Sequence, residues 1–247
     1  MKAMIKEQDL SELVTRLKST AGSNVQSVIL YGSAAAGEFH EGHSDLNVLG
    51  VMRNLAREDV GRLHDASFWW TKKGHPSPLF FTLHELQHSA DIFAIELHDI
   101  KAAYRVLHGD DVIASLEVPM YLHRLQVERE LRNSSLRLRQ QYLGHPEDSR
   151  RTLGLMTSSI STFLTLFRHA LIALGEDPPA TKRETLNRLG SELGFDPAPF
   201  LTILELRERS KRERDLDVQE TFGAYLDRVS KVVDEIDRRL AVPGANR

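Results

Sequence analysis

Hydrophobic and polar positions follow two different periods along the chain, and the change of period divides it. In the first half, short apolar runs bounded by turn-forming residues predict strands over residues 25–31, 46–52, 79–83 and 92–97. Amphipathic segments between and beside these runs predict helices over residues 11–17, 57–71 and 99–107. Strands that alternate with helices in this way predict an α/β or α+β domain.

After Pro119 the apolar residues recur every three or four positions, as on one face of a long helix. The clearest stripe consists of Leu153, Met156, Ile160, Phe163, Leu164, Phe167, Leu171 and Leu174. A similar stripe runs from Val218 to Leu240, and Gly-Pro-rich breaks separate the helices. We therefore predict two domains, residues 1–117 with the sheet and residues 118–247 as a bundle of four or five helices. Such long stripes suit a homodimer as well as a monomeric core.

The composition narrows the chemistry that the chain can perform. It contains no cysteine, which excludes disulfides, thiolate metal sites and a cysteine nucleophile, and favours a reducing, cytoplasmic location. Its N-terminus lacks the continuous apolar run of a targeting signal. No uncharged segment reaches the roughly 20 apolar residues of a membrane span, so we expect no membrane partner. Carboxylates, imidazoles and hydroxyls remain as the reactive groups.

Charge is distributed unevenly but shows no basic excess that would attract nucleic acid. Residues 1–117 carry 11 Lys and Arg against 16 Asp and Glu, and the whole chain has a formal net charge of −3. The densest run, residues 205–217, contains five basic and five acidic side chains. Because binding to a phosphate backbone needs an excess of positive charge, we interpret this run as a solvated helix surface. Nucleic acid is not an expected partner.

The most informative segment is the apolar strand that ends in Gly32-Ser33 and continues into small residues. Glycine lets the backbone approach an anion closely, and N–H groups at a following helix start, with the serine hydroxyl, would bind phosphate. Gly32 and Gly37 have the spacing of a P-loop, but Glu38 and Phe39 stand where that loop needs a lysine and a hydroxyl residue. The pattern therefore predicts a phosphate site that is not a P-loop.

A second strand follows with oxygen-bearing side chains at alternate positions. Asp45 and Asn47 are two residues apart, so they share one face of that strand and point toward Gly32 and Ser33. Glu96 lies inside the later apolar run and is a candidate for a third oxygen ligand. A buried unpaired carboxylate would be costly, so the alternatives for Glu96 are a functional role or a salt-bridged edge position.

These residues resemble the nucleotidyltransferase superfamily, the DNA polymerase β-like fold that includes aminoglycoside and minimal nucleotidyltransferases. The family pattern is a strand, Gly-Ser, a spacer, Asp-x-Asp on the next strand and a later acid, and Gly32, Ser33, Asp45 and Glu96 match it. The resemblance covers about residues 20–110. It implies an α+β fold, with an N-terminal mixed sheet flanked by helices followed by an all-α helical bundle.

The resemblance also implies a reaction and its cofactors. A member of the family transfers a nucleoside monophosphate from ATP or another NTP to a hydroxyl of a small molecule or protein, with carboxylates holding Mg²⁺. By this resemblance, Gly32 and Ser33 contact phosphate, Asp45, Asn47 and Glu96 bind metal, and Glu96 or Asp99 acts as base. Asn47 departs from the pattern, because it stands where the family has its second aspartate. Two functions stay open: a transferase, and a catalytically degenerate nucleotide-binding or assembly module.

Two further motifs indicate other enzyme classes. His84, Glu85 and His88 match the HExxH pattern of zinc metallopeptidases, although the flanking prolines and the next apolar run leave little room for a long helix, which favours a short surface helix. Arg139 and His145 have the spacing of a HEPN ribonuclease, but the Gly-His-Pro context of His145 is also that of a helix end.

Overall fold

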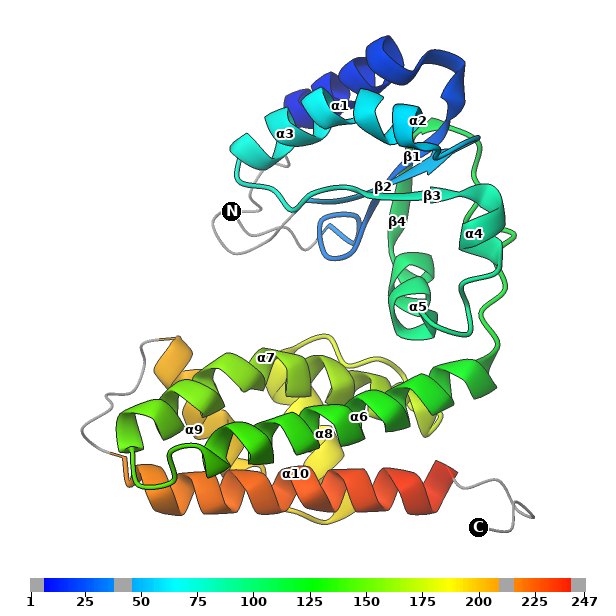
Figure 1. The fold of residues 1–247 in the computed structure, drawn as a ribbon. Helices are drawn as coiled ribbons and strands as arrows, with labels where there is room; N and C mark the ends of the chain where they lie inside the picture. Colours follow the sequence, from blue (N-terminus) through cyan, green and yellow to red (C-terminus); the bar gives the residue numbers. More distant parts are fainter. Residues whose placement is uncertain (1–6, 38–45, 209–215, 241–247) are drawn as a thin grey trace. The chain divides into compact units, whose positions relative to one another are not determined.

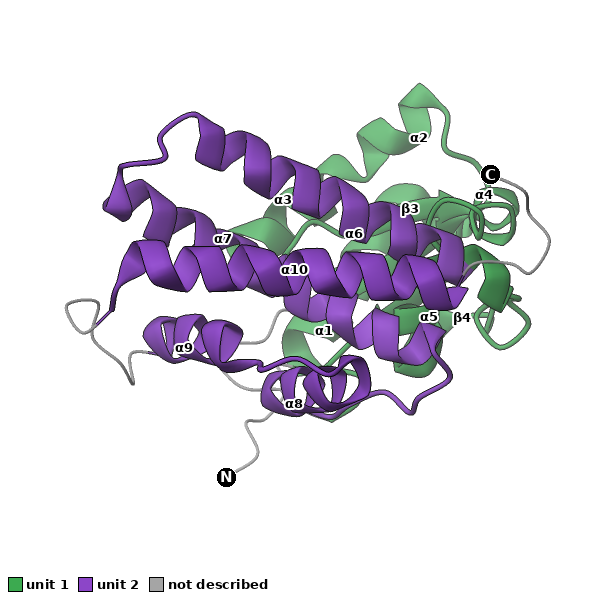
Figure 2. Ribbon diagram, turned by 90° about the horizontal axis from the view of Figure 1, so that it is seen from below, with its two compact units in different colours: residues 1–122 green, residues 123–247 purple. Residues whose placement is uncertain are grey.

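The computed structural model describes residues 7–37, 46–208 and 216–240. It divides into two compact units, residues 1–122 and residues 123–247, which Figure 2 distinguishes by colour. In the described residues, the first unit contains α1 (Glu7–Ala21), η1 (Gly22–Asn24), β1 (Val25–Tyr31), β2 (Asn47–Met52), α2 (Arg57–Arg62), α3 (His64–Lys72), β3 (Leu79–Thr82), α4 (Leu83–Gln87), α5 (Ala94–Ala102) and β4 (Tyr104–Gly109).

The strands form one mixed sheet with the order β3-β2-β1-β4. β1 pairs antiparallel with both β2 and β4, whereas β2 and β3 are parallel. Because β1 and β2 run in opposite directions, the end of β1 and the start of β2 lie at the same edge, where Tyr31 is the cross-strand partner of Asn47. This edge carries the residues that the sequence singles out.

Both faces of the sheet are covered, which explains why β1 and β2 are almost continuously apolar. α1 and α3 cover one face of the sheet (Figure 1). There, Val28, Leu30 and Val48 pack with leucines of α1 and with Trp70 of α3. On the other face, Ile29, Leu49 and Val51 pack with Leu86 of α4 and with Leu97 and Ile100 of α5. The alternation of side chains along each strand thus assigns every residue near the edge to one face.

The chain after residue 92 differs from its prediction. Residues 92–97 do not form a strand, since α5 begins at Ala94, and the predicted helix over 99–107 is replaced by the end of α5 and by β4. A short apolar run has no periodicity that separates a buried strand from a buried helix turn. Ala94, Ile95, Leu97 and Ile100 are buried and Glu96 is exposed, a pattern that one face of a helix produces.

The second unit is helical in its described residues and contains most of α6 (Met120–Leu143), followed by α7 (Ser149–Ala173), α8 (Lys182–Leu193), α9 (Ala198–Arg207) and α10 (Val218–Leu240). α7 begins where the Asp148 side chain accepts a hydrogen bond from the Arg151 N–H, 3.0 Å away. The predicted stripe from Leu153 to Leu171 faces the core, and each of its side chains except Leu153 is below 5% exposure. Aromatic rings of α7, α9 and α10 meet there, with Phe200 4.7 Å from Tyr225 between ring centroids. The predicted α+β fold with a helical bundle is confirmed.

Among the described residues, no helix combines the length and the apolar run that crossing a membrane requires.

Candidate functional site

The turn after β1 brings backbone and small side chains to the sheet edge. Gly32 has φ +81°, a left-handed conformation that favours glycine, and its N–H donates to the Ala103 carbonyl just before β4, 2.9 Å away. The Gly32 carbonyl accepts hydrogen bonds from the N–H groups of Ala35 and Ala36. Residues 33–37 therefore form a tight turn in place of the expected helix start, and the Gly32 N–H is already engaged within the sheet.

Asn47 lies directly beside this turn, at the first position of β2. A Cβ atom built at Gly32 would stand 3.4 Å from the Asn47 Nδ2 atom, so the amide lies against the Gly32 backbone. Asn47 and Tyr31 are cross-strand partners and share the face of Ile29 and Leu49. The predicted meeting of Gly32 with the start of the second strand is therefore present, and Ser33 is exposed next to it.

Glu96 reaches the same face of the sheet from α5 and not from a strand. Its neighbours Leu97 and Ile100 anchor α5 on the face that carries Tyr31 and Asn47. Burial raises the pKa of the Tyr31 phenol above its ordinary value, and the negative charge of Glu96 raises it further. The carboxylate of Glu96 is thus close enough to Tyr31 to act on it electrostatically.

Asp45, together with His40 and His43, lies outside the described residues. Of the three predicted metal ligands, the structure consequently describes Asn47 and Glu96, whose side chains offer an amide oxygen and a carboxylate. Oxygen donors of this kind suit a hard cation such as Mg²⁺.

Sequence reasoning passed over Tyr31, which connects the two described candidates. It is half-buried, and it pairs with Asn47 on one neighbouring strand and with Tyr104 on the other. The charge of Glu96 contributes to the raised pKa of its phenol. Its place directly before Gly32 is the one signal that the sequence offers. A tyrosine at the end of an apolar strand is normally interpreted as a core residue, so the sequence pattern does not indicate a functional role for it.

Comparisons with known proteins bear on this arrangement. No protein-family model matches the chain, and no curated protein sequence matches it. Among solved structures, the spectinomycin adenyltransferase AAD(9) from Enterococcus faecialis, crystallised with ATP and spectinomycin, matches with a TM-score of 0.54 and 17% sequence identity. The match covers 95% of this chain and 98% of that one.

The chain shares the fold of this spectinomycin adenyltransferase. The match extends over nearly the whole length, so the shared fold includes the helical second unit as well as the sheet. The resemblance that Gly32, Ser33 and Asp45 suggest in the sequence is confirmed at the level of the fold.

The HExxH motif begins on α4, a helix of five residues, and its last residue, His88, directly follows that helix. Glu85 caps this helix: its Oε2 atom accepts hydrogen bonds from the Thr82 N–H at 2.7 Å and from the Thr82 hydroxyl at 2.9 Å. The backbone bond, followed by the hydroxyl bond, lowers the pKa of Glu85 below its usual range. Glu85 is therefore occupied by a structural role, and the arrangement lacks the general base that a zinc peptidase needs.

The residues of the ribonuclease motif also have structural contacts in the second unit. Arg139 on α6 donates to the hydroxyl of Ser230 on α10, 3.0 Å away. The His145 N–H donates to the Tyr142 carbonyl in the turn that follows α6. These contacts tie α6 to α10 and end α6.

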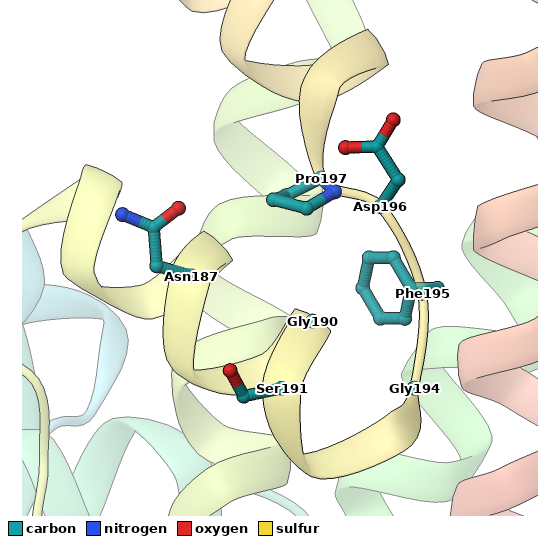
Figure 3. Close-up of a pocket in the computed structure, with 7 residues that line it drawn as sticks. All are labelled: Asn187, Gly190, Ser191, Gly194, Phe195, Asp196 and Pro197. Carbon is teal, nitrogen blue, oxygen red and sulfur yellow. The ribbon is translucent and has the colours of Figure 1, made fainter.

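A hollow of about 450 Å³ lies where α8 turns into α9 (Figure 3). Asn187 and Ser191 line it from α8, and Asp196 belongs to the connecting turn. The Asp196 carboxylate accepts a hydrogen bond from the Ala198 N–H at the start of α9, 3.0 Å away. This lining supplies an amide, a hydroxyl and one carboxylate that already accepts a backbone hydrogen bond, but no acid–base pair.

Proposed function

We propose that this protein is a nucleotidyltransferase that transfers a nucleoside monophosphate from Mg-ATP, or another Mg-NTP, to a hydroxyl of a small-molecule or protein acceptor. The observation that carries the proposal is the contact between Gly32 and Asn47 at one sheet edge of a nucleotidyltransferase fold. ATP is the first nucleotide to consider because the spectinomycin adenyltransferase of the same fold was crystallised with it.

The turn at Gly32-Ser33 is the proposed phosphate contact. Since Gly32 has a left-handed backbone and no side chain, the backbone surface beside Asn47 stays open to a ligand. Ser33 is exposed and adds a hydroxyl that can donate to a phosphate oxygen. The Gly32 N–H is directed into the sheet, so phosphate would bind to the residues after Gly32.

Asp45, Asn47 and Glu96 are the proposed ligands of Mg²⁺, which, when bound, neutralises the triphosphate and orients it for in-line displacement. The support for this role is that Asn47 is the cross-strand partner of Tyr31 at the start of β2, and that the Glu96 charge on α5 acts on the same tyrosine. Glu96 or Asp99 would take the proton from the attacking acceptor hydroxyl. The bond between the α-phosphorus and the bridging oxygen breaks as the bond to the acceptor oxygen forms, and pyrophosphate leaves.

Asn47 favours a second candidate, a nucleotide-binding module without transfer activity. An amide in place of a carboxylate removes one negative charge from the proposed metal site, which weakens its hold on a divalent ion. The two candidates share the nucleotide site and differ in turnover.

Isothermal titration of ATP with and without Mg²⁺ tests the shared site. We expect Mg²⁺-dependent binding that Ser33→Ala and Glu96→Gln weaken by about tenfold or more, because each loses a charge or a hydrogen bond to the ligand. Glu58→Gln is the matched control, because Glu58 is exposed on α2. This variant should bind ATP with the affinity of the parent protein. Absence of binding at millimolar ATP would remove both candidates.

Transfer of label from α-labelled ATP then separates the candidates. Spectinomycin is the first acceptor to test, since the matched structure holds it. Label on an acceptor supports the transferase, whereas ATP binding with no labelled product over a panel of hydroxyl compounds supports the binding module.

A further inference from the structure

The histidines of the HExxH motif remain after their peptidase role is set aside. His84 on α4 and His88, which directly follows α4, are both exposed, and their imidazole rings stack with centroids 4.1 Å apart and planes inclined by 20°. Leu86, between them in the sequence, is fully buried against the sheet. The two rings therefore lie side by side on the exposed side of this segment, and the buried Leu86 holds its other side against the sheet.

The hydrogen bonds of α4 prepare one of these rings for a metal ion. The Nδ1 atom of His88 lies 2.8 Å from the backbone carbonyl of His84, and because a carbonyl only accepts, Nδ1 carries the proton. The Nε2 atom of His88 then holds the lone pair. A metal-binding histidine generally donates its other ring N–H to a carbonyl or carboxylate in this manner, which sets the tautomer and the ring orientation.

The backbone that carries the two rings is well defined for so short a helix. α4 follows β3 directly (Figure 1), and reciprocal hydrogen bonds between Thr82 and Glu85 close its first turn. The His88 N–H donates to the His84 carbonyl, as between residues four apart in a helix, so the two side chains project from the same side and can bind one ion together. Glu85 is engaged with Thr82, so the protein would supply two imidazoles and water would complete the coordination.

We propose that His84 and His88 form a non-catalytic chelate for a borderline transition-metal ion such as Zn²⁺, Ni²⁺ or Cu²⁺ on the surface of α4. Imidazole nitrogens favour these ions and bind Mg²⁺ poorly, so this site is chemically distinct from the oxygen ligands at Asn47 and Glu96. The proposal goes beyond the nucleotidyltransferase function and does not depend on it. A bound ion would join two successive turns of the chain and stabilise α4 in its helical form.

Titration of ZnCl₂ into the 247-residue chain, followed by isothermal calorimetry, tests the chelate. We expect one saturable Zn²⁺ per chain that His84→Gln and His88→Gln each weaken by at least about tenfold, since either change removes one of two protein ligands. His64→Gln is the matched control, because His64 is an exposed helix histidine that stacks on Phe68 and lacks a histidine partner four residues away.

Two independent measurements place the ion. In the Cu²⁺-loaded chain, electron paramagnetic resonance should count two nitrogen ligands, falling to one in His84→Gln. Hydrogen exchange of the α4 amides should slow on addition of Zn²⁺ in the parent and in His64→Gln but not in the two α4 variants. Parent protein that binds no Zn²⁺, or variants that retain its affinity and exchange pattern, would overturn the proposal. Circular dichroism confirms that the variants are folded, as expected for exposed positions.

Discussion

At the scale of single residues, Asn47 decides how strongly the proposed site holds a divalent ion. Its amide lies against the Gly32 backbone and its strand position is the one that an aspartate occupies in the family pattern. The position of residue 47 is therefore compatible with a metal ligand, but the proposed metal site has one negative charge fewer than it would have with an aspartate there. The fold brings the side chain at position 47 close to Gly32, and the identity of that residue as asparagine leaves it uncharged.

Restoring that charge gives a direct prediction. Asn47→Asp is expected to raise the affinity of the ATP-loaded protein for Mg²⁺ by about tenfold, because ligand charge tunes divalent affinity. A Mg²⁺ titration of the nucleotide complex measures it.

Asn54→Asp is the matched control, since Asn54 is exposed beyond the other end of β2. Equal gains in both variants would mean that general electrostatics, and not a ligand at position 47, is responsible.

At the scale of elements, the bundle depends on a buried tyrosine that joins two helices. The Tyr225 hydroxyl on α10 lies 3.1 Å from the Ser159 hydroxyl on α7, and the Tyr225 ring is fully buried among Phe163 and Phe200. Burial raises the pKa of its phenol well above its ordinary value, and the hydrogen bond to Ser159 opposes this only in part. The folded bundle therefore holds this phenol protonated.

This shift predicts an alkaline loss of stability. The unfolded chain releases the Tyr225 proton near its ordinary pKa of about 10, whereas the folded chain keeps it, so unfolding becomes more favourable as the pH rises above that value. The contribution of Tyr225 to the free energy of unfolding is fully present below a pH of about 10. Above that pH it declines by up to about 1.4 kcal/mol per pH unit.

Urea unfolding at several alkaline pH values, compared with Tyr225→Phe, measures this contribution. The free energy of unfolding of the variant should be lower by about 1 kcal/mol at neutral pH, because the variant lacks the hydrogen bond. It should also decline less steeply as the pH rises. Parallel declines in the two proteins would contradict the assignment to Tyr225.

At the scale of the whole molecule, net charge and its distribution limit the partners. The chain carries 32 basic and 35 acidic side chains, and its sheet-containing part is the more acidic one. A phosphate backbone releases counterions only to an excess of positive charge, which this chain does not offer. A nucleotide presented with Mg²⁺ does not meet the same obstacle, because the ion supplies the positive charge.

We accordingly expect no binding of a fluorescent single-stranded RNA or DNA oligonucleotide at moderate salt, measured by anisotropy under conditions in which Mg-ATP binds. Saturable binding that weakens steadily with added salt would show instead that a local basic surface overrides the net charge.

Much of this protein follows from its sequence alone. Strand and helix periods predicted β1, β2 and β3 and the long helices of the bundle, because alternation and three-to-four spacing are local properties of the chain. The apolar run also predicted that Gly32 follows the end of β1. Alternation predicted that Asp45 and Asn47 share a face, which stays a prediction because Asp45 lies outside the described residues.

Only the tertiary structure decided the contents of the sheet edge. α5 replaced the predicted strand, since a six-residue apolar run is compatible with either element, and β4 took the place beside β1. Packing of Leu97 and Ile100 then brought Glu96 to the face of Tyr31. Contacts between residues that are distant in the sequence depend on how elements pack, and no local pattern encodes that packing.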